Sequence, residues 1–267
     1  MVRHLFLAAA LCANFCVWAP AFAQKTDLIV MEKMTSYEIR DAIAAGKTTV
    51  ILPSGGTEQN GPAMATGKHN FRAFADAQTL ARRLGNALVA SVIPYTPEGK
   101  YDPPQGHLRY PGTIGIPEDV YAGVVEGAVR SLKLHGFKNI VLIGDHGSDQ
   151  DGEKLVADKL NKEWAGSGVR VHAILSYYRG DQDGDAAVLA KLGVKKEEMG
   201  NHSDVRDTSR MMAIDPAMVH TDRLEAGNGK NGVEGDPRHA SVAIGKALNA
   251  RILDRTMADI KKSIAAQ

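Results

Sequence analysis

Two apolar runs without polar alternation constrain the fold of this chain most. They are TTVILPSG at residues 48–55 and NIVLIG at residues 139–144. A strand buried on both faces has such a continuous apolar run, whereas a strand with one wet face alternates apolar and polar residues. Each run leads into a glycine-containing loop with polar side chains, and in open α/β sheets ligands gather at the carboxyl ends of the strands. The sequence therefore predicts an α/β fold with a functional site at that edge.

Helical patterns separate these runs from other short strands. Apolar residues recur at helical spacing in 73–89, 118–136, 151–166 and 239–263, and further strands are expected at 91–95 and 169–178. Helices alternating with strands predict an α/β sandwich around a mostly parallel sheet. Residues 94–117 are rich in proline and glycine, and loops of this length in compact domains usually have a function.

The first 23 residues have the pattern of a cleavable signal peptide. Arg3 precedes an apolar stretch, and Ala21-Phe22-Ala23 ahead of Gln24 forms an A-x-A cleavage site. A transmembrane anchor is the alternative, but the stretch is short for a span of about 20 residues. We therefore predict a signal peptide at 1–23, one domain at 24–267, and a periplasmic or secreted protein.

Composition excludes several classes of partner. The net charge is +1, and both cysteines, Cys12 and Cys16, lie in the predicted leader, so an ordinary apolar core must hold the exported chain. A chain this close to neutrality gives no reason to expect nucleic acid or, after signal cleavage, a membrane surface as partner. We expect a small-molecule substrate.

Side chains that suit a metal ion follow both apolar runs. Glu58 and His69 follow the first run and His146 follows the second. Two imidazoles and a carboxylate form a mononuclear metal site, although each residue alone is as readily a structural loop residue. Asp145 and Asp149 flank His146 and are expected to orient its second nitrogen, with helix capping as the alternative for Asp149.

Two more histidines are candidates for substrate chemistry. His107 lies inside the proline- and glycine-rich loop, where a substrate contact and an exposed loop position are both consistent with the sequence. His202 precedes Asp207-Thr208-Ser209 by five residues. Capping of a helix explains the latter three residues but does not account for His202.

The motifs together resemble the creatininase (creatinine amidohydrolase) family, whose first motif has the form E-x-H-G-P-H-L-P-x-G-T-D. The matching segment here runs from Glu58 to His69. Further matches are Tyr110-Pro111-Gly112-Thr113, Asp145-His146-Gly147, His202 with Asp207-Thr208-Ser209, and residues 232–238. They occur in order over nearly the whole mature chain.

The resemblance implies a three-layer α/β/α sandwich, frequently homo-oligomeric, that binds one or two divalent ions and cleaves C–N bonds in amides or cyclic amides. It assigns catalysis to His202, and it places Asp207 at a family glutamate, as a base or a further ligand. The loop around His107 and Tyr110 is expected to close over the substrate. We also assign Asn60 to substrate contact.

Three departures from the family pattern affect the same ion. The family has a bridging aspartate at His69, a histidine at Asn60 and, in creatininase itself, a glutamate at Ser148. All three changes remove ligands from the second metal. Glu58, His69 and His146 remain as a complete set for one divalent ion, for which we expect zinc, with manganese or iron as alternatives.

The sequence thus predicts a periplasmic metal-dependent hydrolase of an amide or cyclic amide, which uses a metal-activated water at a single-ion site. One alternative is a non-catalytic protein on the same scaffold that binds a small molecule or a metal. Another is a lactonase or an iron-dependent enzyme, because two histidines and a carboxylate also suit non-haem iron. Creatinine itself is disfavoured as substrate because the ligands of the second metal are missing.

Overall fold

The computed structural model describes residues 28–266. The predicted signal peptide therefore lies outside the described residues. Within them, four parallel strands form one sheet in the order β2-β1-β3-β4. The strands are β1 (Thr49–Ser54), β2 (Ala87–Val89), β3 (Asn139–Gly144) and β4 (Arg170–Ala173). Strands β1 and β3 are in register over their full length, from Thr49 opposite Asn139 to Ser54 opposite Gly144.

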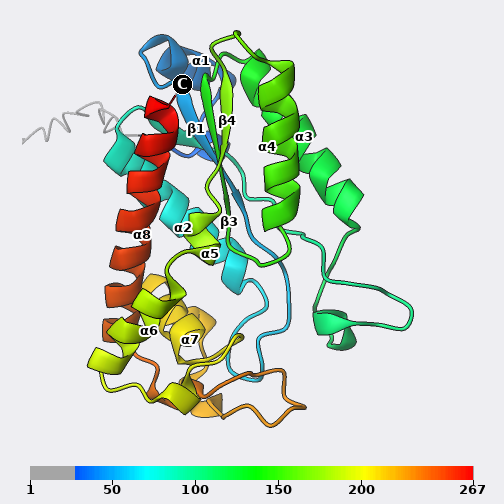
Figure 1. The fold of residues 1–267 in the computed structure, drawn as a ribbon, viewed down its shortest axis with the longest axis vertical. Helices are drawn as coiled ribbons and strands as arrows, with labels where there is room; N and C mark the ends of the chain where they lie inside the picture. The colour runs from blue at the N-terminus through cyan, green and yellow to red at the C-terminus, as the bar shows by residue number, and fades with distance from the viewer. Residues whose placement is uncertain (1–27, 267) are drawn as a thin grey trace, which may run out of the picture.

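Helices cover both faces of the sheet (Figure 1). On one face, α3 (Glu118–Leu134) and α4 (Gln150–Glu163) pack on Leu52 and Leu142. On the other, α2 (Lys68–Leu84) and α8 (Val242–Ala265) pack on Ile51 and Ile143. Because successive residues of a strand point to opposite faces, burial on both sides requires the continuous apolar runs of the sequence. The predicted three-layer α/β/α sandwich is confirmed.

Shorter helices complete the chain. They are α1 (Ser36–Ala44), α5 (Ser176–Arg179), α6 (Gln182–Lys191), α7 (Val205–Ile214) and the 3-10 turns Met31–Lys33, Gly106–Arg109, Lys196–Glu198, Pro216–Met218, Thr221–Arg223 and Pro237–His239. Helix α7 packs on α8 beyond the carboxyl edge of the sheet, at the lower end of the molecule in Figure 1. No helix among residues 28–266 is long and apolar enough to cross a membrane.

The region around β2 differs from the sequence prediction. Helix α2 begins at Lys68 and ends at Leu84, where Gly85 has a φ of +79°, and residues 87–89 pair with β1 as an edge strand. The strand predicted at 91–95 is reduced to a single bridge between Ser54 and Ile93. Helical spacing continued through 89 in the sequence, but a glycine stop and pairing with β1 decided the structure.

The strand order reverses between β1 and β3. After β1 the chain adds β2 on one side, and it then crosses to β3 on the other. Such a switch point leaves a crevice outside the carboxyl ends of the two central strands. Loop 94–117 is joined to the loop after β1 by a bridge from Ile114 to Thr57, and a bridge from Thr96 to Gly115 brings its own two ends together.

Candidate metal centre

Helix α2 turns one buried stripe toward the crevice and the sheet. The stripe runs at four-residue intervals through Lys68, Arg72, Asp76 and Leu80, and all four residues are buried. Its first turns are polar and face the crevice, while its last turns are apolar and pack on the sheet. The loop after β1 passes this helix closely, since a Cβ on Gly55 would lie 2.7 Å from the Asn70 Cα. Glycine therefore lets the loop bring Glu58 to the start of α2.

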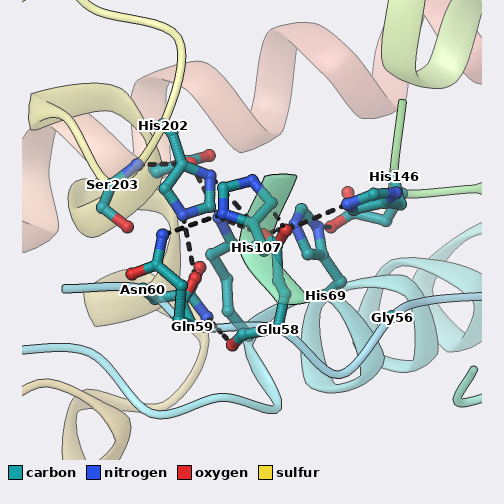
Figure 2. Close-up of polar contacts among 12 residues, drawn as sticks. Gly56, Glu58, Gln59, Asn60, His69, His107, His146, His202 and Ser203 are labelled. Carbon is teal, nitrogen blue, oxygen red and sulfur yellow. Dashed lines mark hydrogen bonds and ion pairs between the residues drawn. The ribbon is translucent and has the colours of Figure 1, made fainter. Parts of the chain in front are cut away.

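Glu58 lies at the centre of the site and is completely buried (Figure 2). Its Oε1 lies 2.7 Å from His69 Nε2 and its Oε2 lies 3.0 Å from His146 Nε2. Lys68 Nζ is 3.3 Å from the same Oε1. Burial alone would raise the pKa of Glu58, but Lys68 and His69 outweigh it and hold this pKa well below its usual value. Glu58 is therefore an ionised carboxylate between two imidazoles.

His69 is oriented by a buried carboxylate. Its Nδ1 lies 2.8 Å from Asp145 Oδ2, and Arg72 Nη2 lies 2.7 Å from the same oxygen. The pKa of Asp145 is lowered because Arg72 outweighs the effect of burial. Arg72 Nη2 also lies 3.2 Å from His69 Nδ1, but the shorter contact of Nδ1 is to the carboxylate, so we infer that Nδ1–H donates to Asp145 and leaves the Nε2 lone pair facing Glu58 Oε1. Two acceptor atoms at 2.7 Å require a proton or a cation between them, as in a metal site with a carboxylate behind the histidine.

Asp145 was predicted to orient His146, and this prediction is wrong because Asp145 orients His69. His146 Nδ1 instead lies 2.7 Å from the Ser148 hydroxyl. Asp149 accepts a hydrogen bond from the His146 backbone N–H at 3.2 Å and makes no side-chain cap at α4. Its expected contact to the imidazole and its alternative role as helix cap are both absent.

Asp207 does not suit the predicted role of base or metal ligand. Its Oδ1 lies 2.7 Å from Arg72 Nη1, and its Oδ2 lies 2.9 Å from Lys68 Nζ and 3.0 Å from the Ser203 nitrogen. Lys68 and Arg72 outweigh burial and hold the pKa of Asp207 well below its usual value. Both oxygens are committed to ion pairs, so Asp207 keeps two buried cations in place and does not carry a proton. The helix cap is Asp204 instead.

His107 and His202 meet Glu58 from the opposite side. Their rings stack with centroids 4.2 Å apart. His107 Nε2 lies 3.3 Å from Glu58 Oε2, and His202 Nδ1 lies 3.5 Å from Glu58 Oε1. Two trios of ligand atoms within 4.8 Å of one another therefore share this glutamate, namely Glu58–His69–His146 and Glu58–His107–His202. Figure 2 shows the four imidazoles around the carboxylate.

Tyr110 and Asn60, the two other predicted substrate contacts, do not contact the Glu58 carboxylate as His107 does. Tyr110 lines a cleft of about 210 Å³ beside His107, and its hydroxyl donates to the Lys230 carbonyl at 3.3 Å. The amide nitrogen of Asn60 is turned to the backbone, where it donates to the carbonyls of Glu58 and Ala65 at 2.9 and 3.0 Å. Its Oδ1 is buried with no hydrogen-bond partner among the described residues. Substrate contact by Asn60 and Tyr110 stays a prediction.

Three charged residues at the centre, Lys68, Arg72 and Glu98, were not predicted from the sequence. Lys68 and Arg72 could have been found by extending the helical stripe back from Leu80, since charged residues on a buried stripe mark a polar centre. Glu98 had no local signal. Its Oε1 lies 3.5 Å from His146 Nε2, and burial raises its pKa to about 7. Only the path of loop 94–117 brings it there.

Comparison with known proteins agrees with this geometry. The family model of creatininase, described as creatinine amidohydrolase, matches residues 32–260. The chain belongs to the creatininase family. Creatinine amidohydrolase of Pseudomonas putida is 28% identical over 203 residues, which cover 73% of this chain and 75% of that protein. A 3-dehydro-scyllo-inosose hydrolase of Thermotoga maritima is 24% identical over 192 residues, which cover 72% of this chain and 58% of that protein.

Solved structures of creatininases share the fold. A zinc–zinc form of a creatininase variant has a TM-score of 0.71 at 21% identity, with 90% of this chain and 99% of that chain covered. A manganese form has a TM-score of 0.69 at 22% identity, with 89% and 97% covered. Family membership together with the buried ligand trio supports metal-dependent amidohydrolase activity.

Proposed function

We propose that this protein is an exported hydrolase that cleaves the C–N bond of an amide or cyclic amide with a single divalent ion held by Glu58, His69 and His146. The observation that carries the proposal is the contact between Glu58 Oε1 and His69 Nε2 at 2.7 Å, with the second nitrogen of His69 held by Asp145. This donor set fits a metal ion. The ionised carboxylate of Glu58 and the imidazoles of His69 and His146 beside it are the oxygen and nitrogen ligands that a divalent ion takes.

A bound divalent ion would supply Lewis acidity, which lowers the pKa of a coordinated water and polarises a carbonyl group. The protein contributes the surroundings of that chemistry. Asp145 keeps the Nε2 lone pair of His69 toward the centre, and burial of Glu58 and His69 keeps bulk water away from it. Such fixed outer contacts orient the ligands and raise their basicity.

His202 contributes an acceptor at the substrate side. Its Nε2 lies 2.9 Å from the Gln59 carbonyl, which can only accept, so Nε2 carries the proton and Nδ1 presents a lone pair to the centre. Burial and the nearby Lys68 lower the pKa of His202 to about 3, so the ring is neutral at ordinary pH. His202 is therefore placed to accept a hydrogen bond from a nucleophile or from a substrate N–H.

A single ion is supported by the residues that stand at the positions of the family's second-metal ligands. The amide nitrogen of Asn60 is bonded to two backbone carbonyls, and the Ser148 hydroxyl is bonded to His146 Nδ1. The ammonium of Lys68, completely buried, already lies 3.3 Å from Glu58 Oε1. Lys68 thus already adds one positive charge to the centre, and in a low-dielectric site two dications beside it would repel each other and Lys68 more strongly than a single ion is repelled.

The proposal also includes the protein's location, its oligomeric state and the identity of the metal. Export to the periplasm rests on Arg3 and the Ala21-Phe22-Ala23 site, and the expected homo-oligomer rests on the family resemblance. Zinc is our first choice because tetrahedral nitrogen and oxygen sites favour it, with manganese or iron as alternatives. The substrate class is small amides and cyclic amides.

The test is metal analysis of protein purified from the periplasm, followed by a panel of amides, cyclic amides and lactones. We expect one equivalent of zinc and turnover of amides, with both lost in His146→Ala. Two equivalents in the wild type, or metal retained in the variant, would contradict the one-ion site. Iron with oxygen consumption, or binding without turnover, would favour the other two functions. N-terminal sequencing that finds Gln24 first would support export.

A further inference from the structure

The second trio, Glu58–His107–His202, has ligand spacing but is not assigned a function by the one-ion hydrolase on which this inference rests. We propose that Gln59 fixes His107 in the tautomer with its proton on Nε2. His107 then donates a hydrogen bond into the centre and cannot bind a second ion. Gln59 is thus a positioning residue that decides between a substrate contact and a metal ligand.

The carboxamide of Gln59 can have only one orientation. Its Oε1 accepts from the Gly61 backbone N–H at 2.9 Å, and its Nε2 donates to the Gly232 carbonyl at 3.0 Å. Reversing the amide would place donor against donor at Gly61 and acceptor against acceptor at Gly232. The nitrogen of the carboxamide therefore faces His107.

This orientation sets the proton on His107. Gln59 Nε2 lies 2.9 Å from His107 Nδ1, and an amide nitrogen is a donor only. His107 Nδ1 must then be the acceptor, and the proton of the ring is on Nε2. That N–H points at Glu58 Oε2, 3.3 Å away. A nitrogen that carries a proton has no lone pair for a metal ion.

The chain is built closely around this carboxamide. Gly232 has a φ of +75°, and a Cβ on it would lie 2.0 Å from Gln59 Oε1. A glycine is required both by the backbone conformation and by the space that Gln59 occupies. The loop carrying Gly232 therefore clamps the amide against His107.

Gln59 also determines the tautomer of His202, the histidine that stacks on His107. The Gln59 backbone carbonyl accepts from His202 Nε2 at 2.9 Å, which leaves His202 with a lone pair on Nδ1. One residue thus makes His107 a donor and His202 an acceptor, with ring centroids 4.2 Å apart. His107 is 29% exposed at the cleft, so a substrate can reach its N–H. A neighbouring donor and acceptor complement the C=O and N–H of an amide.

The direct test is nitrogen-15 NMR of the histidine rings in the full mature protein, metal-free and with one equivalent of zinc. We expect His107 to show a protonated Nε2 and an unprotonated Nδ1 in both states. A protonated Nδ1 in the wild type would overturn the inference. The metal-free spectrum alone decides the tautomer of His107. If the wild type binds no metal, the proposed hydrolase is contradicted, but the tautomer is still determined.

Variants extend the test to metal binding. Gln59→Glu replaces the donor by an acceptor, so Nδ1 of His107 should gain the proton and zinc stoichiometry should rise from one toward two. Gln59→Leu is the matched intermediate variant, which removes the donor without adding an acceptor, so His107 is free to take either tautomer and the zinc stoichiometry should lie between those of the wild type and Gln59→Glu. His107→Ala should keep the zinc affinity of the wild type, whereas loss of zinc in that variant would show that His107 is a ligand and would overturn the inference.

Discussion

Two groups of buried carboxyl side chains lie close together in this protein and have opposite charge states. The front group, at the metal centre, consists of Glu58, Asp145 and Asp207, whose pKa values are all lowered. The rear group, at the start of α4, consists of Asp149 just before the helix and Glu153 in its first turn, whose pKa values are both raised, that of Glu153 to about 8. Asp207 is 17% exposed and the other four acids are buried, and burial opposes ionisation in both groups, so burial does not explain the difference.

The difference comes from the cations that α2 supplies. Lys68 and Arg72 are buried on the front side and contact all three carboxylates. Asp149 and Glu153 form no ion pair among residues 28–266, and the groups that Glu153 meets are the neutral side chains of Ser54 and Tyr121 and the backbone of Gly144. A buried acid without a cation keeps its proton, whereas one with a buried cation stays ionised. Only the front group can therefore attract a metal ion.

The largest expected effect is on stability, in Arg72→Met. This change leaves Asp145 and Asp207 buried without their guanidinium, and breaking such a pair costs about 3–5 kcal/mol of unfolding free energy. Urea denaturation at neutral pH would measure it. Arg82→Met, on an exposed position of the same helix, is the control. Equal losses in the two variants would mean that Arg72 does not hold the front group together.

A second prediction compares neighbouring acids of the two groups. Asp145→Asn weakens the hold on His69 Nδ1, so zinc affinity should fall about 10- to 100-fold. Asp149→Asn should have little effect, because Asp149 contacts the backbone of His146 and not its ring, and burial raises the pKa of its carboxyl group. Calorimetric titration of metal-free protein would compare them. A larger loss in Asp149→Asn would reverse the assignment of the two carboxyls.

A third prediction concerns pH. The folded pKa of Glu153 is raised from 4.5 to about 8 by burial, so the folded state holds a proton that the unfolded state has released. Stability should therefore fall as pH rises from about 5 to about 8, by on the order of 1–3 kcal/mol. Glu153→Gln should flatten this fall and be the more stable protein at pH 8, as followed by thermal unfolding. Exposed Glu197→Gln should keep the wild-type slope.

The smallest effect is expected for Tyr121→Phe beside the rear group. The Tyr121 hydroxyl donates to Ser54 Oγ at 2.9 Å in a buried position, and one such neutral hydrogen bond is worth about 1 kcal/mol. Denaturant unfolding would detect the loss, while zinc affinity should not change. A change in zinc affinity would show that the two groups are coupled through the end of β1.

The sequence predicted β1, β3, the position of β4, most helices and the residues that meet in the first trio because these depend on local patterns, whereas β2 was expected to be the end of a helix. Glu58 and His146 each follow a buried strand, and the carboxyl ends of parallel strands meet at one edge. Asp145 was expected at His146 but lies on His69, and Asp207, expected as a base or ligand, is paired with Lys68 and Arg72, because the partners of both acids come from α2. Which carboxylate meets which cation depends on how helices cross the crevice, and spacing along the chain carries no such information.

By itself the sequence determined the layered α/β fold and the residues available at its edge, since strand burial and helical periodicity are written into successive side chains. Only the tertiary structure decided the protonation of those residues. Lys68 and Arg72 keep the front carboxylates ionised, and the Gln59 amide places the proton of His107 on the nitrogen that faces the centre. Charge and tautomer depend on contacts of about 3 Å between segments distant in sequence, where low dielectric makes each contact decisive.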